Sequence, residues 1–257
     1  MKMLGRRGFL QRLGGMAAAI PSTVGICSPA VASQHRRRIT QSELEAALDL
    51  HSYWIEGDSR GMRAIFNNCD LSGRDFFSDR MEVIHLRGSD FTDADLSGIT
   101  GNEVSFNWSS LQSAQLSWSH LKLPSFCSAT LRRARCDSVL WGWPSETSFQ
   151  IPARIDGWLP QATFINTDLS FTSFDEARVM GFFSETRFTN ASLRDTDLSY
   201  SHIAFDTFFS GSELLRTKFH RASMNAAHFR FAHLTEVDFS FADVGSKCTW
   251  PQGLAQP

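Results

Sequence analysis

The 257-residue sequence has few of the residue patterns that signal a catalytic or metal-binding chain. It contains only five cysteines and two tyrosines, and its eight histidines are scattered along the chain. No histidine or cysteine spacing resembles a zinc site. A glycine-rich phosphate loop and a nucleophile elbow are also missing. We therefore expect no catalytic residue, no cofactor and no bound metal.

Long hydrophobic runs and an excess of one charge are missing as well. The apolar segment at residues 13–20 is too short and too broken to span a bilayer. The whole chain has 25 Lys and Arg and 27 Asp and Glu, for a net charge of −2. Without residues 1–32, which hold four basic residues and no acidic one, the net charge is −6. A mildly acidic chain argues against a general nucleic-acid binder, so we expect no nucleic-acid partner.

Residues 1–32 resemble a twin-arginine export signal that is cleaved. The motif consists of Arg6, Arg7, Phe9 and Leu10, and the small-x-small cleavage site consists of Ala30 and Ala32. A weakly apolar, Gly/Ala-rich segment lies between them. The resemblance implies export by the twin-arginine pathway to the periplasm or beyond, with no stable membrane span after cleavage.

A period of five residues organises the rest of the chain. The first run has centres at Phe66, Leu71, Phe76, Met81, Leu86, Phe91, Leu96, Gly101, Phe106, Leu111, Leu116, Leu121, Phe126, Leu131, Cys136 and Trp141. A second run extends from Phe164 to Val244, and small residues usually stand two positions before each centre. A short fixed period indicates a solenoid whose repeats bury their apolar faces against their neighbours. Four pentapeptides per coil would stack residues that are 20 apart, such as Phe66 on Leu86.

At these residues the chain resembles the pentapeptide-repeat family, whose consensus is A-(D/N)-L-x-x. Residues 94–98, Ala-Asp-Leu-Ser-Gly, match it fully, and residues 69–73, Cys-Asp-Leu-Ser-Gly, match it nearly. The resemblance implies an all-β fold, a right-handed quadrilateral β-helix of about eight coils. Arg74 and Asp79 at small-residue positions and Gly101 at a centre depart from the pattern, so we expect the coil from Arg74 to Gly101 to bulge or open.

Three segments lie outside the two repeat runs, 64–141 and 162–246. Residues 33–63 are predicted to form a solvated basic tail and an N-terminal capping helix over 40–56, with Thr40 and Glu43 at capping-box spacing. The Trp/Pro-rich residues 142–161 contain three prolines, which oppose a regular ladder and predict an insert. Residues 247–257 are predicted to be a C-terminal cap and tail.

An apolar strip beside the insert is the candidate partner surface. It consists of Val83, Leu123 and Trp143, which fall in one outward column, and of Phe149 and Trp158 in the insert. An apolar strip on an outer wall needs a cover. Either the insert folds over its own wall or a partner docks there.

Two stacked aspartate pairs are weaker candidates for chemistry. A 20-residue coil places Asp70 over Asp90 and Asp75 over Asp95, about 4.8 Å apart. Paired carboxylates can perform acid–base work or hold a cation. Aspartate directly before a centre is also the usual residue of the family, which favours a structural role.

Cysteines and aromatic residues give two further expectations. No two cysteines share a column on neighbouring coils, so we expect no structural disulfide. Seven aromatic residues stand two positions after a centre and are expected on corners or outer walls: Trp108, Trp118, Phe171, Tyr200, Phe205, Phe231 and Phe241. Exposed aromatics can stack on sugars or anchor a protein partner.

These observations favour an exported, non-enzymatic solenoid, a monomer that binds an unknown protein in the cell envelope or acts as a scaffold. The alternative is a β-helix that binds or cleaves polysaccharides with outer-wall carboxylates and aromatics. Some members of the family inhibit DNA gyrase by resembling DNA, but that role is hard to reconcile with export. Fold alone does not supply the function.

Overall fold

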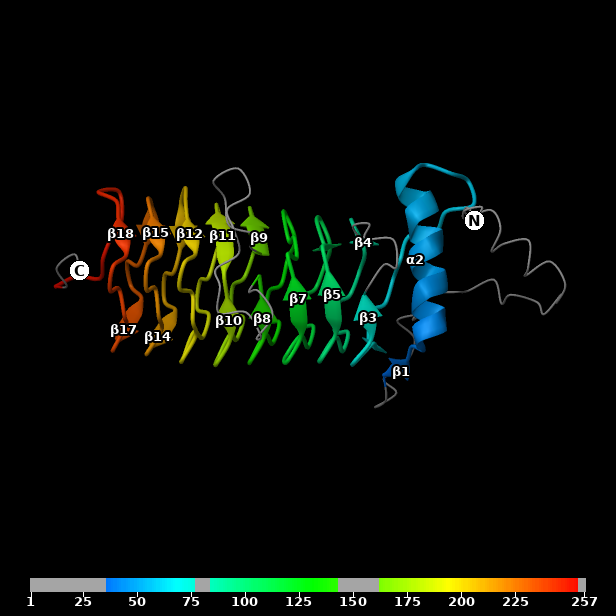
Figure 1. The fold of residues 1–257 in the computed structure, drawn as a ribbon, viewed down its shortest axis with the longest axis horizontal. Helices are drawn as coiled ribbons and strands as arrows, with labels where there is room; N and C mark the ends of the chain where they lie inside the picture. The colour runs from blue at the N-terminus through cyan, green and yellow to red at the C-terminus, as the bar shows by residue number, and fades with distance from the viewer. Residues whose placement is uncertain (1–35, 77–83, 143–161, 254–257) are drawn as a thin grey trace, which may run out of the picture.

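The computed structural model describes residues 36–76, 84–142 and 162–253. One helix precedes a β-solenoid of about seven turns, close to the eight expected. The coils follow one another along the long axis, with the helix at one end and the C-terminus at the other (Figure 1). Helix α2 spans Gln41–Ile55. The strands are β1 (Arg37–Arg38), β2 (Cys69–Asp70), β3 (Asp75–Phe76), β4 (Ile84–His85), β5 (Thr100–Asn102), β6 (Val104–Ser105), β7 (His120–Lys122), β8 (Leu140–Trp141), β9 (Ala162–Ile165), β10 (Arg178–Val179), β11 (Gly181–Ser184), β12 (His202–Ile203), β13 (Thr207–Phe208), β14 (Glu213–Leu215), β15 (Ser223–Met224), β16 (Ala227–His228), β17 (His233–Thr235) and β18 (Asp243–Val244).

Each coil has four sides, and equivalent sides stack into four parallel walls, A to D. Wall A contains Ile65, Asp90, Ser110, Thr130, Asp168, Arg187, Phe208, His228 and Thr249. Wall B contains Asp70, Asp95, Gln115, Arg135, Ser173, Ser192, Glu213 and His233. Wall C contains Asp75, Thr100, His120, Leu140, Arg178, Asp197, Lys218 and Asp238. Wall D contains His85, Ser105, Ser125, Thr163, Phe182, His202, Ser223 and Asp243.

The first coil is longer than the 20-residue coils that the sequence period predicts. Ile65 pairs with Asp90, 25 residues later. Phe66 accordingly stacks on Phe91, with ring centroids 5.4 Å apart, so the predicted stacking of Phe66 on Leu86 is wrong. The five additional positions fall in the sequence between Asp75 on wall C and His85, the first residue of wall D. These additional residues fall within the stretch from Arg74 to Gly101 where we expected a bulged or open coil, but residues 77–83 lie outside the described residues.

The repeat centres point inward and stack as rings along the solenoid. On wall D, the ring centroids of Phe106 and Phe126 are 5.2 Å apart, those of Phe126 and Phe164 5.2 Å, and those of Phe164 and Phe183 4.8 Å. Trp141 is fully buried, and its Nε1–H donates to Ser119 Oγ at 2.9 Å. Burial of these large rings is the main favourable contribution to the stability of the solenoid.

Helix α2 begins with the capping box that the sequence predicts. The backbone N–H of Glu43 donates to the Thr40 side chain, and the Glu43 carboxylate accepts from the Thr40 N–H at 2.8 Å. The helix lies at the N-terminal end of the coils (Figure 1). It therefore covers the open end of the first coil, as a solenoid cap must.

The basic segment before the helix is not the solvated tail that we expected. Strand β1 pairs in parallel with β2, and Arg36 Nε donates to the carbonyl of Asp93 at 3.1 Å. The arginines therefore extend wall B by one strand. No local pattern predicts this contact, because Arg36 and Asp93 are 57 residues apart.

The expectation of no disulfide is also wrong. Cys69 is disulfide-bonded, and its partner lies outside the described residues. The column argument compared only the four cysteines that follow residue 32. Cys127, Cys136 and Cys248 are free.

Among the described residues, no helix has the length and apolarity needed to cross a membrane.

Candidate functional site

The predicted apolar strip falls mainly outside the described residues. Only Leu123 is described, whereas Val83, Trp143, Phe149 and Trp158 are not. Leu123 is half-buried at a corner in the left-handed conformation (φ 56°). The strip therefore remains a prediction.

The predicted export signal is likewise outside the part of the chain that the structure describes. This applies to Arg6, Arg7, Phe9, Leu10, Ala30 and Ala32.

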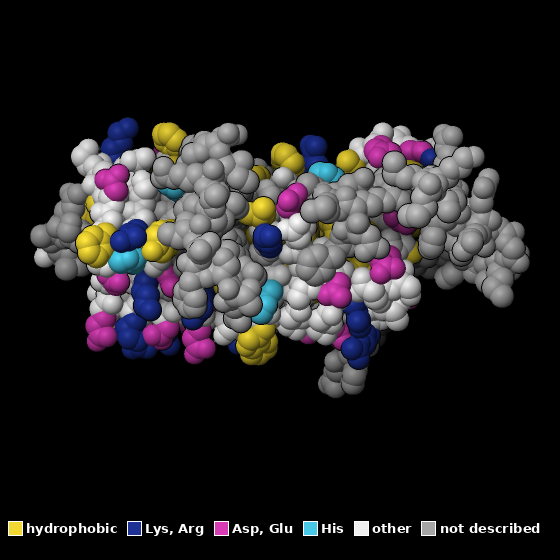
Figure 2. All heavy atoms as spheres, in the orientation of Figure 1, with side chains coloured by type: hydrophobic (Ala, Val, Ile, Leu, Met, Phe, Trp, Pro, Cys, Tyr) yellow, Lys and Arg dark blue, Asp and Glu magenta, His cyan; other side chains and the backbone are white. Residues whose placement is uncertain are grey.

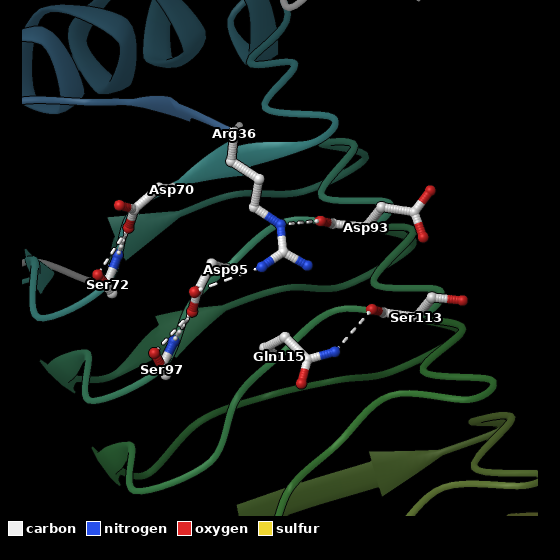
Figure 3. Close-up of polar contacts among 8 residues, drawn as sticks. All are labelled: Arg36, Asp70, Ser72, Asp93, Asp95, Ser97, Ser113 and Gln115. Carbon is white, nitrogen blue, oxygen red and sulfur yellow. Dashed lines mark hydrogen bonds and ion pairs between the residues drawn. The ribbon is translucent and has the colours of Figure 1, made fainter. Parts of the chain in front are cut away.

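The structure rearranges the predicted aspartate pairs. Asp70 neighbours Asp95 on wall B, whereas Asp90 lies on wall A and Asp75 pairs with Thr100 on wall C. The stacking of Asp70 on Asp90 and of Asp75 on Asp95 is therefore wrong, because the first coil has 25 residues. Figure 3 shows Asp70 and Asp95 on successive rungs, each turned toward the serine two residues later.

Both carboxylates of the Asp70–Asp95 pair close local turns. Asp70 Oδ1 accepts from Ser72 N at 2.9 Å and from Ser72 Oγ at 2.6 Å. Asp95 Oδ1 accepts from Ser97 N at 3.0 Å and from Ser97 Oγ at 2.6 Å (Figure 3). The same side chain of Asp95 also meets Arg36 Nη1 at 3.5 Å. Both carboxylates therefore stabilise turns, which is the structural role that the sequence analysis set against a catalytic one.

The pKa of Asp70 agrees with this structural role. Burial by itself would raise the pKa of Asp70, but hydrogen bonds from Ser72, together with the nearby Arg38 and Arg74, lower it below its usual range. A carboxyl group with a lowered pKa is a poor general acid near neutral pH. In the described parts of the chain, no three His, Cys, Asp or Glu side chains gather as a metal site.

Exposed aromatic side chains on the corners are the most unusual surface feature. Their exposed fractions are 53% for Trp108, 66% for Trp118, 44% for Phe171, 68% for Phe205, 68% for Phe231 and 80% for Phe241. All but Phe205 have a positive φ, between 57° and 65°. A bulky residue in this conformation costs about 1 kcal/mol or more, and exposure recovers little of it. The expectation of outward aromatics is confirmed, and their backbone conformation adds that they are held there at a cost.

Four arginines lie against these aromatic rings. The guanidinium carbon is 4.2 Å from the ring centroid for Arg87 on Trp108, 4.8 Å for Arg132 on Phe171 and 4.9 Å for Arg230 on Phe231. Arg221 lies 6.0 Å from the Tyr200 centroid and 5.8 Å from that of Phe241. These are cation–π distances.

Other exposed arginines are matched by carboxylates instead. Arg194 bonds to Glu213 at 2.7 Å, and Arg216 holds Asp195 through two nitrogens, at 2.6 and 2.7 Å. Within residues 36–76, 84–142 and 162–253, none of the four ring-stacked arginines has a carboxylate within ion-pair distance. These four arginines thus offer a charge beside an aromatic ring, whereas Arg60, Arg194 and Arg216 are held by carboxylates. The sequence places the aromatics on corners but does not reveal which arginines join them.

One corner, between walls C and D near the C-terminal end, carries such residues on three successive coils. We call Tyr200, Arg221 and Phe241 the aromatic–arginine row. Figure 2 shows hydrophobic, basic and histidine side chains gathered near the C-terminal end of the visible face. His220 lies edge-on to both rings, with centroids 6.0 Å from Tyr200 and 5.5 Å from Phe241. The row is therefore a line of packed neighbours along the axis.

Comparison with known proteins agrees with the described coils. The family model "Pentapeptide repeats (8 copies)" matches residues 207–244. Among curated proteins, no sequence match is found.

Several solved structures are similar to this chain at low identity. HetL from Nostoc sp. strain PCC 7120, a pentapeptide-repeat protein involved in heterocyst differentiation regulation, is 18% identical, with 80% of this chain and 97% of that chain covered and a TM-score of 0.36. QnrB1, a plasmid-mediated fluoroquinolone resistance protein, is 15% identical, with 70% and 77% covered and a TM-score of 0.30. Rfr23 from Cyanothece 51142 is 13% identical, with 72% and 90% covered and a TM-score of 0.15. Likenesses at these values carry no functional information. The four walls of parallel pairs show a β-solenoid, and the match at residues 207–244 agrees with a pentapeptide-repeat fold.

Proposed function

We propose that the protein is an exported, non-enzymatic solenoid that binds another protein through its corners. The observation that carries the proposal is the set of arginines stacked on exposed aromatic rings without a carboxylate partner among the described residues. Aromatic residues and arginine are the residue types that dominate binding energy at protein interfaces. The proposal places the partner in the cell envelope and treats the protein as a monomer.

The cost of the corner aromatics supports a binding role. Asparagine, aspartate or glycine would occupy a left-handed corner with less strain than tryptophan or phenylalanine. Trp118 keeps this conformation with φ 60° while two thirds of its side chain is exposed. Strain kept at an exposed position that gains little burial is typical of a functional surface.

Export is consistent with the contacts at the N-terminal end. Cleavage after Ala32 would leave β1 and Arg36 in the mature chain, and these residues extend wall B. These strand contacts would survive cleavage, whereas Cys27, the one cysteine besides Cys69 that is not described as free, would be lost with the signal.

The polysaccharide alternative has less support. It needs a wall that carries both the paired carboxylates and an exposed aromatic. The carboxylates of Asp70 and Asp95 are occupied by Ser72 and Ser97, and Asp90 lies on a different wall. Exposed aromatics alone can still stack on sugars.

Partner capture tests the proposal. The full-length protein, tagged at its C-terminus, is expressed in its own host, cross-linked in the envelope fraction and analysed by mass spectrometry. A variant with Trp108, Phe171 and Phe231 changed to Ser is compared with a control carrying Arg194→Gln and Arg216→Gln. We expect one dominant partner for the wild type and the control, and its loss from the aromatic variant. Capture of no protein, or equal capture by both variants, contradicts the proposal.

Export has its own test. Arg6→Lys with Arg7→Lys should leave the protein in the cytoplasm at full length, because twin-arginine export depends on the arginine pair. Normal processing of this variant would contradict export by that pathway.

A further inference from the structure

We propose that the aromatic–arginine row binds an amphipathic helix of the partner, with an acidic side chain on Arg221 and apolar side chains on Tyr200 and Phe241. This inference rests on the proposed protein-binding function and specifies the surface and the chemistry of the partner.

The three residues of the row occupy equivalent positions on neighbouring coils. The Tyr200 N–H donates to the carbonyl of His220 at 3.0 Å, and the Arg221 N–H donates to the carbonyl of Ser240 at 3.0 Å. All three row residues have a left-handed backbone, with φ of 61°, 55° and 57°. Because successive coils are about 4.8 Å apart, the row presents a ring, a guanidinium and a ring at that interval.

The guanidinium of Arg221 has a charge that the described residues do not match. Asp197 and Asp238 on the adjoining wall C accept from the backbone N–H groups of Ser199 and Ser240, at 3.0 and 2.8 Å. Neither these two carboxylates nor Asp243 on wall D forms an ion pair with Arg221 in the described structure. Lys218, on wall C of the same coil, is a second exposed positive charge beside Arg221.

An exposed arginine flanked by rings suits a carboxylate ligand. The planar guanidinium can stack on an aromatic face and still direct its N–H groups at a carboxylate in a bidentate pair. The rings of Tyr200 and Phe241 on either side would exclude water from that pair, which strengthens it. His220 contacts both rings and holds the row in place.

The interval of the row selects a helix rather than an extended segment. Side chains on one face of an α-helix recur at i, i+3 or i+4, and i+7, with a pitch of 5.4 Å. Alternate residues of a strand that share a face are about 6.7 Å apart, which does not match about 4.8 Å. The difference between coil and helix accumulates to only about 1 Å over two turns. A row of three coils is therefore long enough for one helix face and too short to lose register.

The partner motif that follows is apolar at i, acidic at i+4 and apolar at i+7. The probes are two fluorescein-labelled helical peptides with Leu at i and i+7, identical except for Glu or Gln at i+4. Fluorescence anisotropy measures their binding to the purified protein. We expect the Glu peptide to bind about tenfold more tightly than the Gln peptide.

Variants assign the preference to the row. Arg221→Gln should abolish the preference for Glu, and Phe241→Ala, at a position that is 80% exposed, should weaken both peptides. Arg216→Gln, on another corner, should change neither. Equal binding of the two peptides to the wild type, or an unchanged preference in Arg221→Gln, overturns the inference.

The envelope capture separates this inference from the proposed function. If Arg221→Gln retains the captured partner and the peptides show no preference, the row is not the site although the protein-binding function stands. If the wild type captures no protein, the proposed function fails and the inference fails with it. Loss of the partner from Arg221→Gln together with the peptide preference supports both.

Discussion

The side-chain amide of Gln41 pairs with the backbone of Asp75 as a neighbouring strand would. Gln41 Nε2 donates to the Asp75 carbonyl at 3.0 Å, and the Asp75 N–H donates to Gln41 Oε1 at 3.2 Å. Helix α2 thereby satisfies the exposed edge of wall C. On wall A the Ala64 N–H donates to His51 Nδ1 at 3.1 Å, and on wall B strand β1 pairs with β2. An edge whose backbone N–H and C=O groups are already hydrogen-bonded cannot pair with a strand of another molecule.

Gln41→Ala should lower the free energy of unfolding by about 1 kcal/mol, because two backbone groups at the edge lose their partner. Urea unfolding measures the change. Gln112→Ala, at an exposed position on a later coil, is the matched control and should stay within about 0.5 kcal/mol of the wild type. Equal effects of the two variants would show that the amide pair does not stabilise the cap.

His51 should make the protein less stable in mild acid. Burial, with Arg63 and His85 nearby, lowers the pKa of His51 to about 4, although the backbone of Arg87 opposes this shift. Protonation would also place a hydrogen on Nδ1, which accepts from Ala64 N–H. The unfolded chain takes up this proton near pH 6.5 and the folded chain only near pH 4. The contribution of neutral His51 is therefore complete above about pH 7, falls between 6.5 and 4, and totals about 2–3 kcal/mol.

The measurement is urea unfolding at several pH values for the wild type, His51→Gln and the control His120→Gln. His51→Gln should be less stable at pH 7 and should show a smaller decrease between pH 6.5 and 4. His120 is exposed on wall C, so its substitution should leave the pH dependence as it is. A wild-type slope in His51→Gln would rule out this histidine as the cause.

Gly101→Ala should destabilise the protein by about 1–3 kcal/mol, because the core has no room for a methyl group there. A Cβ would lie 2.6 Å from Val104 Cγ2 and 3.2 Å from both Leu121 Cδ2 and Phe76 Cβ. Thermal and urea unfolding test this. Lys122→Ala, an exposed change on the neighbouring strand, should have little effect; a Gly101→Ala variant as stable as that control would show that the core can expand.

Trp118→Asn should stabilise the fold by about 0.5–1 kcal/mol while weakening partner capture. Asparagine adopts the left-handed conformation more readily than tryptophan, and Trp118 gains little from its 66%-exposed ring. Ser113→Asn, at a corner with φ 57°, is the control that removes no ring and should leave capture intact. A loss of stability in Trp118→Asn would mean that the ring is structural.

The five-residue period predicts the walls well wherever it is unbroken. Ser105 and Ser125 pair on wall D at the predicted separation, and the small residues Ala94 and Ala114 are buried. The period fails in the first coil, where the paired residues Ile65 and Asp90 are 25 positions apart instead of 20. One miscounted pentapeptide then shifts every predicted partner of residues 65–76, including both aspartate pairs.

The features that the sequence does not reveal depend on contacts between distant residues. Arg36 begins a run of three arginines that is typical of a solvated tail. Only its hydrogen bond to the carbonyl of Asp93 shows that it belongs to a wall. The aromatic corners could be predicted, since each stands two positions after a centre. Their arginine partners could not, because Arg87 and Trp108 come from different coils and both are exposed.

The coil-by-coil pairing also determines how the protein would respond to mechanical force. Each coil is bonded only to its neighbours, so tension applied along the axis should detach coils one at a time from an end. A 20-residue coil releases about 65 Å of chain, and the 25-residue first coil about 80 Å. A protein held by its two ends would lengthen coil by coil, and the length of each step would report how many residues the opened coil contains.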